Sequence, residues 1–103
     1  MRKLVEEVFK NIGYGIITYN QKENANGVDM WVKTLNGNPK SVEIKKARKL
    51  KNNTYQCSAV EKNRLNDDII AIVINNYVLV EPMQDHLKCC APKGTRNFTI
   101  MCK

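Results

Sequence analysis

The sequence predicts an α/β domain in which helices flank a single mixed sheet, with the elements in the order αβββαββ. Three observations carry this prediction: an amphipathic segment at residues 2–12, two alternating segments around Asn36-Gly37, and a continuous apolar segment at residues 69–74. They match, in turn, a surface helix, a β-hairpin and a strand covered on both faces.

The N-terminal segment is expected to form a helix over residues 2–12, because its apolar side chains recur at helical spacing between charged ones. Gly13 is a natural stop for that helix. Residues 15–19 are β-branched and aromatic and predict a strand. Residues 20–27 are polar and rich in turn formers, which is typical of a loop.

Two alternating segments predict a central hairpin. Residues 28–34 and 41–47 each alternate apolar and polar side chains, which is the pattern of a strand with two different faces. Asn36-Gly37 between them is a strong hairpin turn sequence. Residues 48–54 are basic and polar and predict a loop.

The second half of the chain predicts one more helix and further strands. The four residues from Ser58 have capping-box spacing, so a short helix is expected over about residues 58–65. Residues 69–74 and 77–82 are expected to pair as a hairpin. The polar tail that follows carries one more candidate strand at residues 97–102.

Length and composition favour one ordinary folded domain. The 103 residues predict a single domain over 1–103, with a core over about 2–81 and a C-terminal extension over 83–103. No apolar segment approaches the roughly 20 residues that cross a bilayer, so we expect no membrane association and a cytoplasmic location. The 17 Lys and Arg against 10 Asp and Glu give a net charge of +7. That balance favours polyanionic partners, although a basic surface without a specific partner is the alternative.

The four cysteines are interpreted as unpaired thiols of a reducing compartment. Cys57, Cys89, Cys90 and Cys102 contain no C-x-x-C pair. A zinc site built from three of them with His86 is the alternative, but its spacing fits no common zinc pattern.

Three residues of the central hairpin suggest chemistry. Glu43 and Lys45 share one face of their strand, since alternate residues of a strand point the same way. Asp29 lies on the neighbouring strand, across a tight turn, so all three side chains are expected to converge. Two carboxylates from adjacent strands suit a hard cation such as Mg²⁺, and a lysine beside them stabilises developing negative charge.

These residues resemble the PD-(D/E)XK nuclease superfamily, which includes type II restriction enzymes and archaeal Holliday-junction resolvases. The resemblance rests on Gly27-Val28-Asp29 followed by Glu43-Ile44-Lys45, and on the order of elements over about residues 2–81. Val28 replaces the proline of the named motif.

The resemblance implies a fold like that of restriction endonucleases and roles for several residues. Asp29 and Glu43, with the Ile44 carbonyl, would bind Mg²⁺ or Mn²⁺, and Lys45 would assist the attacking water. It also implies weaker candidates for the site, on the first helix and around the second: Glu6, Glu7, Gln56, and Glu61 with Lys62.

A basic segment adjoins the proposed centre. It is interpreted as a rim that follows phosphates, against the alternative of a solvated loop. Trp31 shares the face of Asp29 and either stacks on a base or packs in the fold. Asp67-Asp68 is interpreted as a helix-to-strand loop rather than a metal pair. The basic residues are Lys40, Lys45, Lys46, Arg48, Lys49 and Lys51.

The resulting hypothesis is a Mg²⁺-dependent endonuclease that hydrolyses DNA phosphodiester bonds as a homodimer, in a bacterial, archaeal or phage-infected cell. One alternative is a module of the same fold that binds nucleic acid without cleaving it. Another is a phage or mobile-element protein, such as an inhibitor, whose basic face meets an acidic partner.

Overall fold

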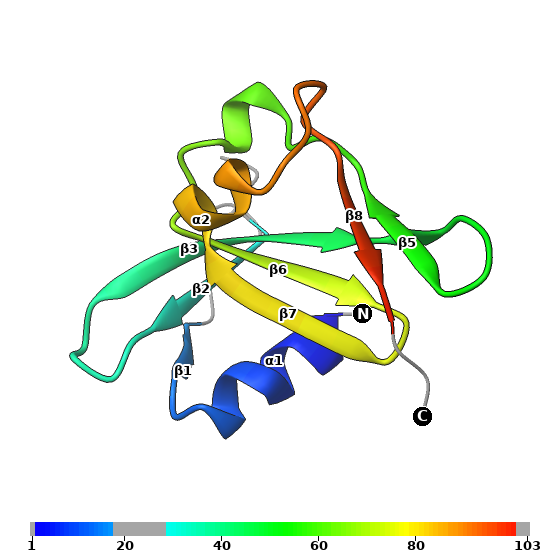
Figure 1. Cartoon of the computed structure of the whole chain (residues 1–103). Helices are drawn as coiled ribbons and strands as arrows, with labels where there is room; N and C mark the ends of the chain where they lie inside the picture. Colours follow the sequence, from blue (N-terminus) through cyan, green and yellow to red (C-terminus); the bar gives the residue numbers. More distant parts are fainter. Residues whose placement is uncertain (1, 18–28, 101–103) are drawn as a thin grey trace.

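The computed structural model of the chain describes residues 2–17 and 29–100. Its elements form a five-stranded mixed sheet with helices and a second, three-stranded sheet (Figure 1). In chain order they are α1 (Arg2–Asn11), β1 (Gly15–Ile17), β2 (Met30–Lys33), β3 (Pro39–Lys46), β4 (Arg48–Lys49), β5 (Thr54–Cys57), the 3-10 turn η2 (Lys62–Arg64), β6 (Ile69–Ile74), β7 (Tyr77–Pro82), α2 (Met83–Lys88) and β8 (Arg96–Thr99).

The larger sheet has the strand order β1-β2-β3-β6-β7, and the smaller sheet has the order β4-β5-β8. Within the larger sheet β3 and β6 are parallel, and the other neighbours are antiparallel. The predicted α/β class with a mixed sheet and helices is therefore confirmed. The second sheet is an addition that the sequence did not predict.

Helix α1 forms where the apolar spacing predicts it and covers one face of the larger sheet. Val5 and Phe9 are fully buried against apolar side chains of that face. The helix ends at Asn11, and Gly13 in the turn after it has φ +92° and donates its N–H to the Lys10 carbonyl at 3.0 Å. A Cβ there would lie 2.8 Å from Leu35 Cδ2, so the exposed Leu35 side chain would have to move. The predicted stop is confirmed.

The hairpin of β2 and β3 is formed by the turn that the sequence predicts. Gly37 has φ +86° and donates its N–H to the Thr34 carbonyl at 2.9 Å. The strands then pair in antiparallel register, with Met30 opposite Val42. This register sets which side chains share a face, and so it positions the candidate site.

Strands β6 and β7 form the predicted second hairpin. Residues 70–74 are all buried, as a continuous apolar strand in the middle of a sheet should be. Parallel strands cannot be joined by a tight turn, so the chain between β3 and β6 must cross over one face of the sheet.

The crossover differs from its prediction. Residues 48–54 were expected to be a loop, but β4 and β5 form a hairpin there, with Asn52 at φ 56° in its turn. The expected helix over residues 58–65 is replaced by the single turn η2, and Glu61 before it makes no side-chain capping bond. Both predictions, the loop and the helix, were wrong. Each rested on local sequence preference, whereas the pairing of β5 with the distant β8 decides the conformation here.

The residues after β7 pack into the fold. Met83 and His86 of α2 are buried, and the Met83 N–H donates to the Asp68 carbonyl at 3.0 Å. β8 overlaps the candidate strand at residues 97–102 but pairs with β5, in the smaller sheet. The segment expected to be an extension therefore supplies α2 and β8 over residues 83–99.

The larger sheet has a different core on each face. On the α1 face, helix side chains pack against β2, β3 and β6. On the opposite face α2 and the smaller sheet enclose a second core, and Figure 1 shows α1 and α2 on opposite sides of the sheet. The members of this second core are Ala47, Cys57, Ile70, Ile72, Ile74 and Met83.

Some sequence predictions lie partly or wholly outside the described residues: the end of the strand at 15–19, the loop at 20–27, and Cys102. The three described cysteines are free thiols, with Cys57 buried. No helix in the described ranges is long and apolar enough to cross a membrane.

Candidate functional site

Asp29 and Glu43 lie side by side on the face of the sheet opposite α1. Met30 opposes Val42, so Asp29, one residue earlier, comes next to Glu43. The Asp29 carboxylate is held in place, because its Oδ2 accepts a hydrogen bond from the Ile44 N–H at 2.9 Å. The two predicted carboxylates therefore share a face and a neighbourhood, as alternation along the two strands requires.

The Glu43 carboxyl is buried, with 7% of its residue surface exposed. Burial, first, and then a hydrogen bond to Asp29 and the charge of Asp29 raise the pKa of Glu43 from its ordinary 4.5 to about 8. At neutral pH and without a cation, the pair therefore retains a proton that a solvated carboxyl would lose.

Lys45 lies on the same face, two residues along β3, and its charge lowers the pKa of Glu43. Its ammonium is held by the crossover, because Nζ donates to Ser58 Oγ and to the Ala59 carbonyl, each at 3.2 Å. The amine is thus near the carboxylates while two hydrogen bonds direct it toward residues 58–59.

A third carboxylate, which the sequence analysis interpreted as part of a loop, belongs to this neighbourhood. Asp67 has 9% of its surface exposed, and its charge raises the pKa of Glu43. Its own pKa is raised by burial first, and also by the charge of Asp29. We call Asp29, Glu43 and Asp67 the carboxylate cluster. In the sequence, the available clue was Asp67-Asp68 directly before an apolar strand. That clue becomes informative only once it is known that β6 lies beside β3.

Asp68, next to it, has a structural role. Its Oδ2 accepts from the Ser41 N–H at 3.0 Å, and its own N–H donates to Ser41 Oγ at 3.1 Å. These bonds fix the start of β6 against β3.

The candidates from α1 do not join the cluster. Arg2 Nη1 donates to the Asp29 main-chain carbonyl at 3.0 Å, and Arg2 Nε lies 4.0 Å from Glu6 Oε2. Glu7 is exposed. Within the described residues no hydrogen bond or ion pair links either glutamate to the Asp29 or Glu43 side chain.

The candidates from the crossover also lie apart from the carboxylates. Gln56 is on β5, where its Oε1 accepts from Arg48 Nη2 at 3.1 Å. Glu61 and Lys62 are exposed around η2. Gln56 therefore belongs to the smaller sheet, beside a basic side chain.

The predicted basic rim follows the end of β3 into β4. Four of its side chains are exposed, whereas Lys40 is half-buried and lines a small cavity of about 270 Å³ with Asp68. Trp31 is half-buried at a position paired with Ser41. The exposed members are Lys46, Arg48, Lys49 and Lys51.

The donor set suits a hard divalent cation that keeps part of its water. Carboxylate oxygens of Asp29 and Glu43 are the ligand type that Mg²⁺ and Mn²⁺ prefer. Among residues 2–17 and 29–100, no three His, Cys, Asp or Glu side chains come together as a metal-binding group. The zinc alternative includes Cys102, which lies outside the described residues; of its other members, His86 Nε2 lies 3.4 Å from Cys90 Sγ.

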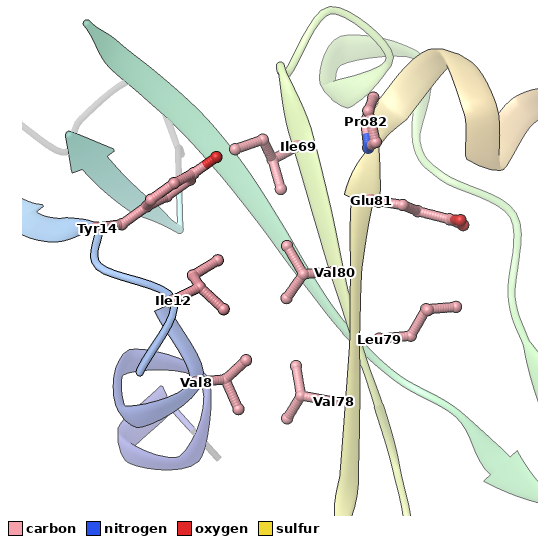
Figure 2. Close-up of a pocket in the computed structure, with 9 residues that line it drawn as sticks. All are labelled: Val8, Ile12, Tyr14, Ile69, Val78, Leu79, Val80, Glu81 and Pro82. Carbon is pink, nitrogen blue, oxygen red and sulfur yellow. The ribbon is translucent and has the colours of Figure 1, made fainter. Parts of the chain in front are cut away.

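A larger apolar groove, of about 490 Å³, lies elsewhere, between α1 and β7. Figure 2 shows Val8 and Ile12 facing Val78 and Val80 across it, while Leu79 and Glu81 point to the other side of the strand. Its lining includes none of the carboxylate cluster, so it is separate from the candidate site.

No protein-family profile matches the sequence, and no curated protein matches it either. Among solved structures, the fold is similar to that of a bacterial homing endonuclease, I-Ssp6803I, with a TM-score of 0.75. The two sequences are 11% identical, and the match covers 99% of this chain and 72% of that one. The likeness shows a nuclease-like fold.

Proposed function

We propose that the protein is a divalent-metal-dependent endonuclease of the PD-(D/E)XK type that hydrolyses DNA phosphodiester bonds. The observation that carries the proposal is the pairing of half-buried Asp29 with buried Glu43, with Lys45 on the same face of the β2–β3 hairpin. The shared fold with a bacterial homing endonuclease supports it.

In this proposal Asp29, Glu43 and the Ile44 carbonyl hold Mg²⁺ or Mn²⁺. When bound, the cation supplies a nucleophile at neutral pH and polarises the phosphate. Glu43 must release its proton for the cation to bind, because the protonated carboxyl is a poor ligand. The Ile44 N–H keeps Asp29 oriented throughout.

Lys45 and the exposed basic side chains bind the substrate. Lys45 has three N–H donors and uses two on Ser58 and Ala59, which leaves one for a phosphate oxygen. Lys46, Arg48 and Lys49 neutralise neighbouring phosphates without reading base sequence. Two copies of the chain would be needed to cut both strands of a duplex, since each contributes one Asp29–Glu43 pair.

The test is cleavage of plasmid DNA with Mg²⁺ or Mn²⁺ by the wild type, Asp29→Asn and Glu43→Gln. Both variants should lose at least 100-fold in rate while retaining DNA binding, because they remove negative charge only. Asp85→Asn, which removes an exposed acid from α2, is the matched control and should cut normally. Wild-type rates in the two site variants would refute the assignment.

A second candidate is a module of the same fold that binds DNA without cutting it. The observation in its favour is that Lys45 Nζ donates to Ser58 and Ala59 rather than to the carboxylates. Salt-dependent DNA binding by a wild type that never cleaves with either metal would select this function.

A further inference from the structure

Asp67 is held in a fixed place beside the Asp29–Glu43 pair. β6 runs parallel to β3, with Ile70 opposite Glu43, and Asp67 comes three residues before Ile70. The Asp67 N–H donates to the Arg64 carbonyl at 3.1 Å, and the next residue is bound to Ser41 of β3. The backbone therefore fixes Asp67 at the edge of the site.

The Asp67 carboxylate is buried and incompletely satisfied. Its Oδ2 is shielded from solvent and has no hydrogen-bond partner within the described residues. A hydrogen bond with Ser41 and the charge of Arg64 favour the ionised form of the Asp67 carboxyl. Neither of them gives Oδ2 a hydrogen-bond donor. An unpaired buried oxygen destabilises the folded chain, so its retention calls for an explanation.

The neighbour Asp68 makes the contrast clear. Asp68 is exposed, and its carboxylate accepts a hydrogen bond from the main-chain N–H of Ser41. Asp67 Oδ2 has no such donor within the described residues, and burial and the charge of Asp29 raise the pKa of its carboxyl.

A hydrated divalent cation would supply what the cluster lacks. Its positive charge offsets the three carboxylates, and its remaining waters are hydrogen-bond donors. Among the described residues the three acids do not form one metal-binding group, so we take Asp29 and Glu43 as the direct ligands and Asp67 as an outer residue. Carboxylates in that outer position orient the ligands and waters of metal sites.

We propose that Asp67 is a positioning residue for the cation, whose unpartnered Oδ2 accepts a hydrogen bond from a water of the cation held by Asp29 and Glu43. This inference rests on the proposed metal site. It adds a residue from the start of β6, outside the β2–β3 hairpin, to that site.

The test is binding of Mn²⁺ to the full chain without DNA. Calorimetry measures the affinity, and thermal unfolding is compared with and without the metal. Asp67→Asn should weaken Mn²⁺ binding about 10-fold, and Asp67→Ala should weaken it further. Asp29→Asn should abolish binding, and Asp85→Asn should leave it within two-fold of wild type.

Thermal unfolding without metal separates binding from folding damage. Asp67→Asn should melt at or above the wild-type temperature, because it removes a buried charge that like charges surround. Equal Mn²⁺ affinity of wild type, Asp67→Asn and Asp67→Ala would overturn the role of Asp67 and leave the metal site standing. A wild type that binds no Mn²⁺ would overturn both the metal site and the role of Asp67.

Discussion

Two groups of ionisable side chains lie on the same side of the larger sheet, and they differ in how their charges are balanced. The carboxylate cluster contains three acids, with Lys45 directed toward the crossover. The second group, which we call the ion-pair network, contains Glu81, His86 and Arg96.

The ion-pair network is compensated within the chain. Arg96 Nη1 donates to Glu81 Oε1 and lies 3.2 Å from His86 Nδ1. The Arg96 guanidinium also sits over the Phe98 ring, 4.7 Å from its centre. Burial, first, and the charge of Arg96 lower the pKa of His86, so the imidazole is neutral at pH 7.

This difference distinguishes charges that stabilise the fold, because the chain itself balances them, from charges that a ligand would have to balance. The opposite charges of Glu81 and Arg96 join β7 to β8, and Arg96 also contacts His86 of α2. Like charges in a buried place cost stability, and under the proposed function a bound cation would compensate them.

The largest expected effect comes from breaking the ion-pair network. Arg96→Met leaves Glu81 and His86 without their cation, and it should lower the free energy of unfolding by about 2–3 kcal/mol. Urea unfolding at pH 7 measures this. Arg48→Met, on an exposed arginine, should cost less than about 0.5 kcal/mol. Equal losses from the two variants would mean that the network contributes no more than a surface contact.

A smaller effect, of opposite sign, is expected in the carboxylate cluster. The pKa of Glu43 is raised in the folded chain, so between about pH 4.5 and 8 the folded state binds more protons than the unfolded state. Stability of the metal-free wild type should therefore fall as pH rises through this range. Glu43→Gln should remove that dependence and stabilise the chain at pH 8.5 by about 1 kcal/mol.

Urea unfolding of wild type and Glu43→Gln at pH 5.5 and pH 8.5 makes this comparison. Glu7→Gln, an exposed glutamate of α1, is the control and should follow the wild type at both values. If Glu43→Gln destabilises the chain at pH 8.5, the cluster is not under repulsion.

The smallest expected effect concerns how Lys45 is held. Ser58→Ala removes one exposed hydrogen bond from the Lys45 ammonium, so stability should change by less than about 0.5 kcal/mol. Cleavage should slow by about two- to five-fold, because the amine is less well oriented. Ser58→Thr keeps the hydroxyl and should restore the rate. A rate unchanged in Ser58→Ala would show that this bond does not orient Lys45 in the reaction.

Local patterns in the sequence predicted the parts of the fold that local chemistry controls. Gly13, the Asn36-Gly37 turn and the alternation around Glu43 are short-range features, so α1 and the β2–β3 hairpin were predictable. The convergence of Asp29 and Glu43 followed from that hairpin alone. Whether these residues bind a metal and catalyse cleavage stays a prediction.

Long-range pairing decided what the sequence analysis missed. β5 became a strand because β8 pairs with it, and nothing near Tyr55 in the sequence reports that partner. Asp67 reached the cluster because β6 runs parallel to β3, a contact between distant segments. Neither contact leaves a periodic pattern in the residues that form it.

The pairing of β5 with β8 also has a consequence for synthesis of the chain on the ribosome. The core beneath α1 uses residues up to β7, so it is able to form as soon as β7 has emerged. The second core must wait for Phe98, which packs against it from β8. During that interval Tyr55 and Cys57 lack their partner strand, and this unpaired edge is where a nascent chain is most open to aggregation or chaperone binding.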